Sequence, residues 1–384
     1  MAEALRVAAC IPRRPWPNPP VGALVVRDGR VVGRGAHEGP GLAHAEVLAL
    51  EEAGPLAEGA TLYCTLEPCN HWGRTPPCAP RVAASGVRRL VVGIADPSPA
   101  IIGGGLKVLS GAGLEVTTGV LASDALDLIW PFAATRAFER PFVLLKTAAS
   151  LDGRFGPNPR PQASRGAPVY LTGEDARRDV HRLRRWADVV LVGEGTLAVD
   201  HPRLDGRLAQ DGDACPVADP APGYVDTDLS YAGPWPAGHP LVFAGRTRAG
   251  RAARSRVERG GATVIACDER EGRVAPESLL HQVFTGIGKV ILIEGGPTLA
   301  AAFLRAGLVD RWVQYTAPLL LGDGPAWPAW TSQAGVKAGQ PFHLTRVERI
   351  GTDVKAVFDR LPFDEVMHDL TTGRHRPHGG PGGG

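Results

Sequence analysis

The chain has 384 residues, of which 44% are hydrophobic and 21% are charged, with a formal net charge of +2. This length exceeds what one hydrophobic core usually serves, so we expect two globular domains, and the balanced charges give no reason to expect a nucleic-acid partner. Because no apolar run approaches the ~18 residues of a membrane span, and Met1–Cys10 is too short and too charged for a signal peptide, we expect a cytoplasmic protein without a membrane partner.

The first 139 residues follow the alternation of a layered α/β domain. An amphipathic helix comes first, followed by two strands joined at Asp28-Gly29, a strong hairpin signal because the turn needs positive φ. Helices and strands then alternate. We expect helices at 2–9, 44–53, 78–85, 103–111 and 121–140, and strands at 21–26, 31–35, 61–66 and 89–94.

A second α/β domain is expected over 140–364. Thr172 is placed to cap its first helix. Segment 205–239 is rich in Pro, Gly and Asp and predicts a long surface loop with little core structure, while the tail 365–384 is predicted to be disordered. We expect strands at 142–146, 189–193, 241–244, 262–267 and 289–294, and helices at 174–186 and 298–306.

Three short segments of the first domain point to a catalytic zinc ion. His44 and Cys78 stand at expected helix starts, where the helix dipole favours thiolate over thiol, and Cys69 follows a strand. One imidazole and two thiolates supply three ligands and leave a fourth position for water, whose pKa zinc lowers to about 7. Glu46 remains as a proton shuttle. His-x-Glu with Pro-Cys-x-x-Cys is the zinc-deaminase signature, but here eight residues separate the cysteines.

The alternative is a structural zinc site, which would need a fourth ligand from Cys64, His71 or His37. We expect Cys64 to be buried and to point away from the site. A structural site also has no use for Glu46, so the pattern favours catalysis. The remaining cysteines, Cys10, Cys215 and Cys267, are expected to be ordinary buried or chance thiols.

Motifs along nearly the whole chain closely resemble the bifunctional deaminase-reductase of riboflavin biosynthesis. The segments that carry the resemblance are PNPPVG (17–22), HAEV (44–47), TLEPCNHWGRTPPC (65–78), KTAASLDG (146–153), VGEGT (192–196), DHPRL (200–204) and EGGPTL (294–299). The eight-residue insertion with Gly-Arg-Thr-Pro-Pro is that family's variation on the deaminase motif. The resemblance implies a cytidine-deaminase-like three-layer α/β/α domain followed by a dihydrofolate-reductase-like α/β domain.

The implied activities use Zn²⁺ and NADPH on a small pyrimidine ribotide phosphate. The first domain would hydrolytically deaminate 2,5-diamino-6-(5-phosphoribosylamino)pyrimidin-4-one, and the second would reduce the ribosyl side chain to ribityl. We also expect a homo-oligomer, either a dimer or a tetramer.

The same resemblance implies roles for further residues. Asn18, His37, His71 and Arg74 would bind substrate in the first domain, although each also fits an ordinary turn or solvated loop. Arg184 would bind the ribose phosphate, against the simpler interpretation of a solvated basic helix face. The other substrate residues would be Leu204, Arg207 and Glu294. The NADPH residues would be Ala149, Tyr170, Thr196, Asp200, Gly295, Gly296, Pro297, Thr298, Leu299, Ala300 and Ala301.

Residues alone support only part of this cofactor assignment. Gly295-Gly296-Pro297-Thr298 lies between a strand and a helix, where glycines allow close backbone approach and free amides accept phosphate. No G-x-G-x-x-G or Walker pattern occurs, so without the family this would be a weak phosphate-loop signal. The role of Lys146 is open between catalysis and phosphate binding.

Several positions depart from the family pattern, mostly in the second domain. Pro168 stands where the family has a substrate-binding Ser, Tyr170 replaces a Trp, and Ala244-Gly245 replaces Asp-Ser. Gly104 replaces a basic residue, and segment 205–239 is longer than typical. An altered or inactive reductase is therefore one alternative, a zinc-stabilised binding protein without chemistry is another, and balanced charge argues against a nucleic-acid deaminase.

Overall fold

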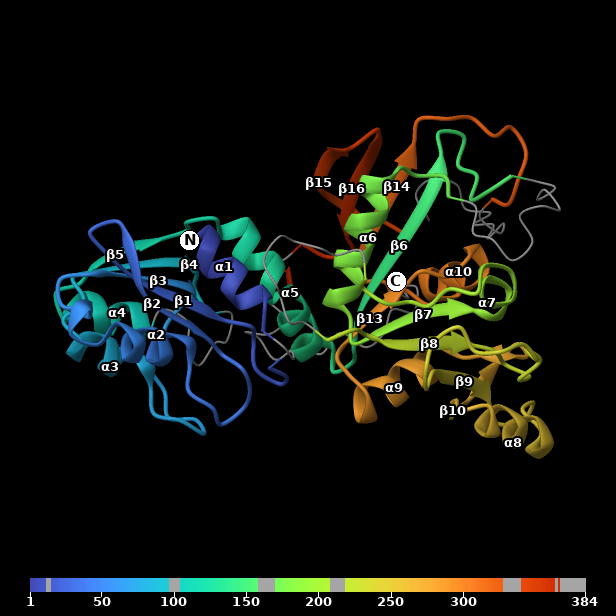
Figure 1. Cartoon of the computed structure of the whole chain (residues 1–384), viewed down its shortest axis with the longest axis horizontal. Coiled ribbons are helices and arrows are strands. Elements are labelled where there is room, and N and C mark those ends of the chain that lie inside the picture. Colours follow the sequence, from blue (N-terminus) through green and yellow to red (C-terminus); the bar gives the residue numbers. More distant parts are fainter. Residues whose placement is uncertain are drawn as a thin grey trace, which may run out of the picture. The chain divides into compact units, whose positions relative to one another are not determined.

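The computed structural model in Figure 1 describes residues 1–11, 15–96, 104–157, 170–207, 218–326, 340–362 and 365–366. The chain divides into two compact units, one over Met1–Phe138 and one over most of 139–362, and each is described by itself. Both units are built on a mixed α/β sheet, so the predicted α/β class is confirmed. In the described part of the chain, none of the helices combines the length and apolar character needed to cross a membrane.

The first unit has a five-stranded sheet in the order β2-β1-β3-β4-β5. The β1–β2 hairpin turns at Asp28 and Gly29, whose φ angles of 49° and 73° are positive as the sequence predicts. Strand β1 also pairs antiparallel with β3, whereas β3–β4 and β4–β5 are parallel. The elements are α1 (Ala2–Ala9), β1 (Gly22–Arg27), β2 (Arg30–Ala36), α2 (Ala45–Ala53), the 3₁₀ helix η1 (Gly54–Ala57), β3 (Thr61–Leu66), α3 (Cys78–Ala84), β4 (Arg89–Ile94), α4 (Gly104–Gly111), β5 (Glu115–Thr118) and α5 (Ala122–Phe138).

Helices cover both faces of this sheet, which confirms the three-layer prediction. Gly22 of β1 faces α1, where a Cβ would lie 2.2 Å from the Ala4 carbonyl oxygen, so only glycine permits this approach. Ala23 points to the other face and shares a buried cluster with Ala45 and Ala49 of α2. The metal-ligand candidates lie on the same side of the sheet as α2.

The second unit has a nine-stranded sheet in the order β10-β9-β8-β7-β13-β6-β14-β16-β15. In this sheet order, every neighbouring pair from β10 through β9, β8, β7, β13 and β6 to β14 is parallel. The carboxyl ends of these strands therefore meet at one edge of the sheet. Its elements are β6 (Phe142–Ser150), α6 (Glu174–Trp186), β7 (Val189–Gly193), α7 (Glu194–Asp200), β8 (Ala221–Val225), β9 (Leu241–Gly245), α8 (Arg251–Arg259), β10 (Thr263–Cys267), β11 (Glu269–Arg270), β12 (Arg273–Val274), α9 (Pro276–Gly286), β13 (Val290–Ile293), α10 (Pro297–Arg305), β14 (Arg311–Ala317), β15 (His343–Ile350) and β16 (Asp353–Asp359).

The prediction of a structureless loop over 205–239 is wrong at 221–225, where the chain forms strand β8. Strand β8 lies inside the sheet between β7 and β9. Tyr224 on this strand is fully buried, and its hydroxyl donates to the Pro202 carbonyl at 2.9 Å. Proline and glycine are depleted from strands, so the local sequence around Pro222 and Gly223 predicts a turn. Packing between neighbouring strands nevertheless places this segment in the core.

Some smaller predictions are wrong, and others concern residues outside the described ranges. Gly173, not Thr172, is the N-cap of α6, and no side chain caps that helix. Cys10 is disulfide-bonded rather than a chance thiol, whereas Cys267 is buried as expected. Pro168, residues 208–217 and the tail beyond 366 lie outside the described residues. The sequence does not predict strands β5, β8, β11, β12, β14, β15 and β16 or helices α7, α8 and α9.

Candidate active sites of the two units

His44, Cys69 and Cys78 come together in the first unit, with their ligand atoms all within 4.8 Å of one another. His44 is the N-cap of α2, Cys78 is the first residue of α3, and Cys69 follows β3. The His44 Nδ1 lies 3.1 Å from the Cys78 Sγ and 3.5 Å from the Cys69 Sγ. Nitrogen and sulfur ligands around a tetrahedral zinc ion lie about 3.5 Å apart. The donor set therefore fits zinc with one position left open.

The surroundings of these ligands favour metal binding. The His44 Nε2, which faces away from the sulfurs, lies 3.1 Å from the Thr75 hydroxyl. This contact orients the ring so that Nδ1 can present its lone pair. The Cys78 backbone N–H donates to the Cys69 Sγ at 3.4 Å. Hydrogen bonding by Cys78 and then by His44 holds the pKa of Cys69 below its usual range, which favours the thiolate that a metal requires.

Glu46 lies in the first turn of α2, two residues after His44, and is only 3% exposed. Burial raises the pKa of its carboxyl to about 7. A general acid-base works best when its pKa lies near the working pH. Glu46 is therefore suited to accept and return protons beside the metal at neutral pH.

Asn18 and His37, both predicted to bind substrate, form a pair beside the metal cluster. The His37 Nδ1 lies 3.2 Å from the Ala43 carbonyl oxygen, which can only accept, so Nδ1 carries the hydrogen. The His37 Nε2 then accepts from the Asn18 Nδ2 at 2.8 Å. Burial lowers the pKa of His37, which keeps the ring neutral. The His37 ring meets the His44 ring edge-on, with centroids 5.1 Å apart, so the pair of Asn18 and His37 lies next to a metal-ligand candidate.

No fourth ligand joins the metal cluster among the residues that the structure describes. Cys64 is fully buried in the core of the first unit, as expected. His37 is hydrogen-bonded to Asn18 and Ala43, and His71 is exposed in the insertion between the cysteines. Arg74 is exposed in the same insertion.

Glu67 is a site residue that sequence reasoning missed. Its buried carboxylate accepts from the backbone N–H groups of Gly105, Leu106 and Asp96 at 3.0, 3.2 and 3.2 Å. These bonds hold the N-terminus of α4 against the loop that carries Cys69. The sequence showed Glu67 within Glu-Pro-Cys, but its partners lie about 30 to 40 residues further along the chain and are set by tertiary structure.

The second unit has a pocket of about 880 Å³ at the carboxyl ends of its parallel strands. Predicted cofactor residues that line it are Thr196, Asp200, Gly296, Pro297, Thr298 and Leu299. Ala300 and Ala301 lie instead in the buried core under α10. Ala149, Tyr170 and Gly295 are not among the residues that line the pocket. Gly296 is the N-cap of α10, whose free amides are suited to phosphate.

Arg184, Glu294 and Lys146 form a buried charged cluster in the second unit. The Arg184 guanidinium makes two bonds to Glu294 and donates through Nη1 to the Asp205 carbonyl at 3.0 Å. Burial lowers the pKa of Lys146, partly opposed by Glu294. Burial alone would raise the pKa of Glu294, but Arg184 and Lys146 more than offset this effect. Arg184 is thus a buried ion-pair partner and does not lie on a solvated helix face.

The other predicted residues of this unit are spread more widely. Leu204 is buried, with a positive φ of 62°. Arg207 is exposed and pairs with Asp205. Tyr170 is 59% exposed, and the Arg177 guanidinium lies 4.6 Å from its ring centroid.

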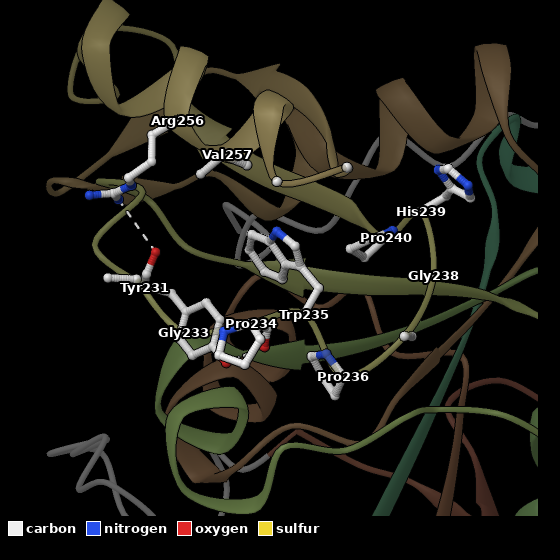
Figure 2. Close-up of a pocket in the computed structure, with 14 residues that line it drawn as sticks. Tyr231, Gly233, Pro234, Trp235, Pro236, Gly238, His239, Pro240, Arg256 and Val257 are labelled. Carbon is white, nitrogen blue, oxygen red and sulfur yellow. Dashed lines mark hydrogen bonds between the residues drawn. The ribbon is translucent and has the colours of Figure 1, made fainter.

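A further pocket of about 620 Å³ contains none of the predicted site residues (Figure 2). Its walls come from 231–240 and from α8 and the turn that follows it. Trp235 stacks on Tyr224 with centroids 5.7 Å apart and meets Tyr231 at a tilt with centroids 5.1 Å apart. Arg256 donates to the Leu229 and Tyr231 carbonyls. The polar side chain of Arg256 is thus used to hold the 231–240 segment on the sheet.

Comparison with known proteins decides the family. The profile of the RibD C-terminal domain matches residues 141–356, and that of the cytidine and deoxycytidylate deaminase zinc-binding region matches 1–94. The riboflavin biosynthesis protein RibD of Bacillus amyloliquefaciens is 38% identical, with 88% of this chain and 90% of that protein covered. The Escherichia coli RibD is 35% identical, with 92% and 96% covered. The chain belongs to the RibD family.

Solved structures agree with this membership. A RibD structure from Acinetobacter baumannii is 31% identical, has a TM-score of 0.69, and covers 93% of this chain and 97% of its own. A Thermotoga maritima structure titled as a diaminohydroxyphosphoribosylaminopyrimidine deaminase/5-amino-6-(5-phosphoribosylamino)uracil reductase is 29% identical, with a TM-score of 0.69 and coverage of 94% and 97%. As a RibD family member, the chain is a bifunctional zinc-dependent deaminase and NADPH-dependent reductase of riboflavin biosynthesis.

Proposed function

We propose that His44, Cys69 and Cys78 hold the zinc ion of the deaminase and that Glu46 is its proton shuttle. The observation that carries this proposal is the convergence of three ligand atoms within 4.8 Å beside a buried carboxyl whose pKa is raised to about 7. Zinc, when bound, lowers the pKa of a coordinated water to about 7. A three-ligand set leaves room for that water, whereas a structural site is closed by four ligands.

The substrate of this unit is 2,5-diamino-6-(5-phosphoribosylamino)pyrimidin-4-one, which loses its 2-amino group. Glu46 takes one proton from the attacking water and returns it to the ring nitrogen. It then moves the second proton from the added hydroxyl to the amino group, which departs as ammonia. Asn18, fixed by His37, presents its Oδ1 to the polar edge of the ring. His71 and Arg74 lie exposed on the insertion, where they can meet the phosphoribosyl group.

The second unit reduces the ribosyl group of the deaminated product to ribityl. NADPH would supply the hydride, and the pocket residues 193–196, 199–200 and 296–299 would hold it, with the free amides at the N-terminus of α10 available to one of its phosphate groups. Lys146 and Glu294 would contact the sugar, and Arg184 keeps the Glu294 carboxylate ionised and oriented. The intact buried cluster supports an active reductase over the alternative of an inactive one.

Glu46→Gln separates the two activities in one protein. We expect the variant to retain one zinc per chain but to lose ammonia release by about 10²- to 10⁴-fold. NADPH oxidation should disappear with the diamino substrate yet persist with the deaminated one, because only the first step is blocked. Glu51→Gln, exposed on the same helix, is the matched control.

The outcomes discriminate between the alternatives. Wild-type ammonia release by Glu46→Gln would overturn the shuttle role. A wild-type protein that releases no ammonia would support a zinc-stabilised binding protein, and ammonia release without NADPH oxidation would support an inactive reductase. The homo-oligomeric state and the cytoplasmic location stay predictions, and light scattering of the purified protein tests the first of them.

A further inference from the structure

The reductase pocket extends well beyond the α10 N-terminus to loops that carry no predicted site residue. Its far part is lined by 226–228, Ser230, Arg248 and 272–274. Arg248 follows β9 and Gly296 follows β13, and three strand spacings of about 4.8 Å separate these strands, or about 14 Å. A dinucleotide lying across the carboxyl ends of the strands suits such a span. With one end of the coenzyme at α10, the other end reaches the Arg248 side of the pocket.

Arg248 and Arg273 supply positive charge at this far end, and they are the cationic side chains among the described residues that line the pocket. Arg248 is held by Asp228, with Nε 2.5 Å from Oδ1 and Nη2 3.2 Å from Oδ2. This pairing fixes the guanidinium plane and leaves Nη1 to donate to an anion. Both side chains of the pair are about half exposed, so solvent screens the ion pair and a phosphate can approach Nη1 without displacing Asp228.

The nearby acidic residue Asp226 does not compete for these arginines. Its carboxylate accepts from the backbone N–H groups of Ser230 and Tyr231 at 3.0 and 2.9 Å. The loop bearing Arg248 is likewise fixed, because Glu269 accepts from the N–H groups of Thr247 and Arg248 at 2.8 and 3.1 Å. The arginine therefore projects from an ordered loop.

Gly245 at the end of β9 contributes no side chain to this region. A Cβ there would lie 2.5 Å from the Glu269 Oε1, so the bonds that order the loop leave no room for a polar side chain at 245. Recognition of an anion at this lip consequently falls to Arg248 and to Arg273 on β12.

We propose that Arg248 and Arg273 bind the 2′-phosphate of NADPH and give the reductase its preference for NADPH over NADH. Arginine recognises phosphate through charge-assisted hydrogen bonds, and the 2′-phosphate is the group that distinguishes the two coenzymes. The inference rests on the proposed function, because it takes the pocket to be the coenzyme site.

The test compares Kd and steady-state values for NADPH and NADH in wild-type protein, Arg248→Ala and Arg273→Ala. Each variant should lose NADPH affinity by about tenfold or more, while NADH affinity stays within about twofold. The probes 2′,5′-ADP and 5′-AMP should show the same contrast without chemistry. Arg246→Ala is the matched control, because Arg246 lies on the same loop but pairs with Asp268 and does not line the pocket.

Equal loss of both coenzymes, or no loss of either, would overturn the proposal. So would a wild-type protein that binds NADH as tightly as NADPH, although NADH-dependent reduction would then leave the proposed function intact. If the wild type oxidises neither coenzyme with the deaminated substrate, the proposed function and the inference fail together.

Discussion

Arg184 binds both carboxylate oxygens of Glu294, with Nε 2.6 Å from Oε1 and Nη2 3.0 Å from Oε2. The pair connects α6 to the residue that follows β13, and the two side chains are only 12% and 7% exposed. Such a pair is costly to break because removal of one partner leaves a buried charge uncompensated. It therefore ties the stability of the second unit to the geometry of its candidate substrate site.

Arg184→Ala should lower the free energy of unfolding of the second unit by about 3–5 kcal/mol. NADPH oxidation should fall with it, whereas ammonia release by the first unit should persist. Urea unfolding followed alongside both activities measures these effects. Arg178→Ala, on the same helix but in an exposed pair with Glu174, should cost less than about 1 kcal/mol, and an equal loss in both variants would contradict the prediction.

Gly105→Ala should impair zinc binding and deamination. A Cβ at Gly105 would lie 1.8 Å from the Pro68 carbonyl oxygen, so the loop that carries Cys69 has to move. Zinc content by mass spectrometry and ammonia release measure the effect. Gly104→Ala is a close control, because its Cβ would meet nothing nearer than 3.9 Å. Full zinc occupancy in Gly105→Ala would count against the packing argument.

The second unit should lose stability as the pH falls from about 6.5 to about 4. Burial, followed by the charges of Arg184 and Arg207, lowers the pKa of His181 to about 4 from its ordinary value of 6.5. Between these values the unfolded chain binds a proton that the folded chain does not, so unfolding is favoured by acid. The stabilisation is present above pH 6.5 and is lost through this window.

His181→Gln isolates this effect from the carboxylates that titrate in the same range. The difference in unfolding free energy between the wild type and the variant should shrink as the pH is lowered, in urea titrations at a series of pH values. His281→Gln, at an exposed position of α9, should follow the wild type. A pH-independent difference for His181→Gln would refute the assignment.

Tyr224→Ala should lower the free energy of unfolding of the second unit by about 3–5 kcal/mol, because a fully buried aromatic ring is lost from the sheet. Tyr224→Phe should cost only about 0.5–1.5 kcal/mol, the contribution of the hydrogen bond to Pro202. Leu320→Ala, at a side chain that is 72% exposed, should stay within about 0.5 kcal/mol. A small change in the free energy of unfolding for Tyr224→Ala would contradict the conclusion that strand β8 lies in the core.

Local sequence signals were sufficient to predict most helices and strands of the first unit. The Asp28-Gly29 turn, the helix starting at His44 and the strand at 61–66 each depend on residues close together in the chain, and the structure has all three. The metal-ligand candidates stand at the boundaries of such elements, so grouping them needed only the order of strands and helices.

The features that could not be predicted depend on contacts between residues far apart in the chain. Arg184 and Glu294 are 110 residues apart, and the basic run around Arg184 looks like a solvated helix face until β13 is placed beside it. The role of Glu67 depends on the position of α4, which the sequence does not show. The strand β8 forms because it pairs on both sides, despite the low strand preference of Pro222 and Gly223. The sequence carries no local trace of these contacts.

Thr75 belongs to the insertion between Cys69 and Cys78, yet its hydroxyl lies against the ring of His44. The segment that we propose to bind the ribotide is therefore also in contact with a proposed zinc ligand. Substrate choice and metal retention are then not independent traits in this unit. A loop exchange designed to accept a different nucleotide must preserve the Thr75 contact, or the new specificity will arrive in a protein that holds its metal less firmly.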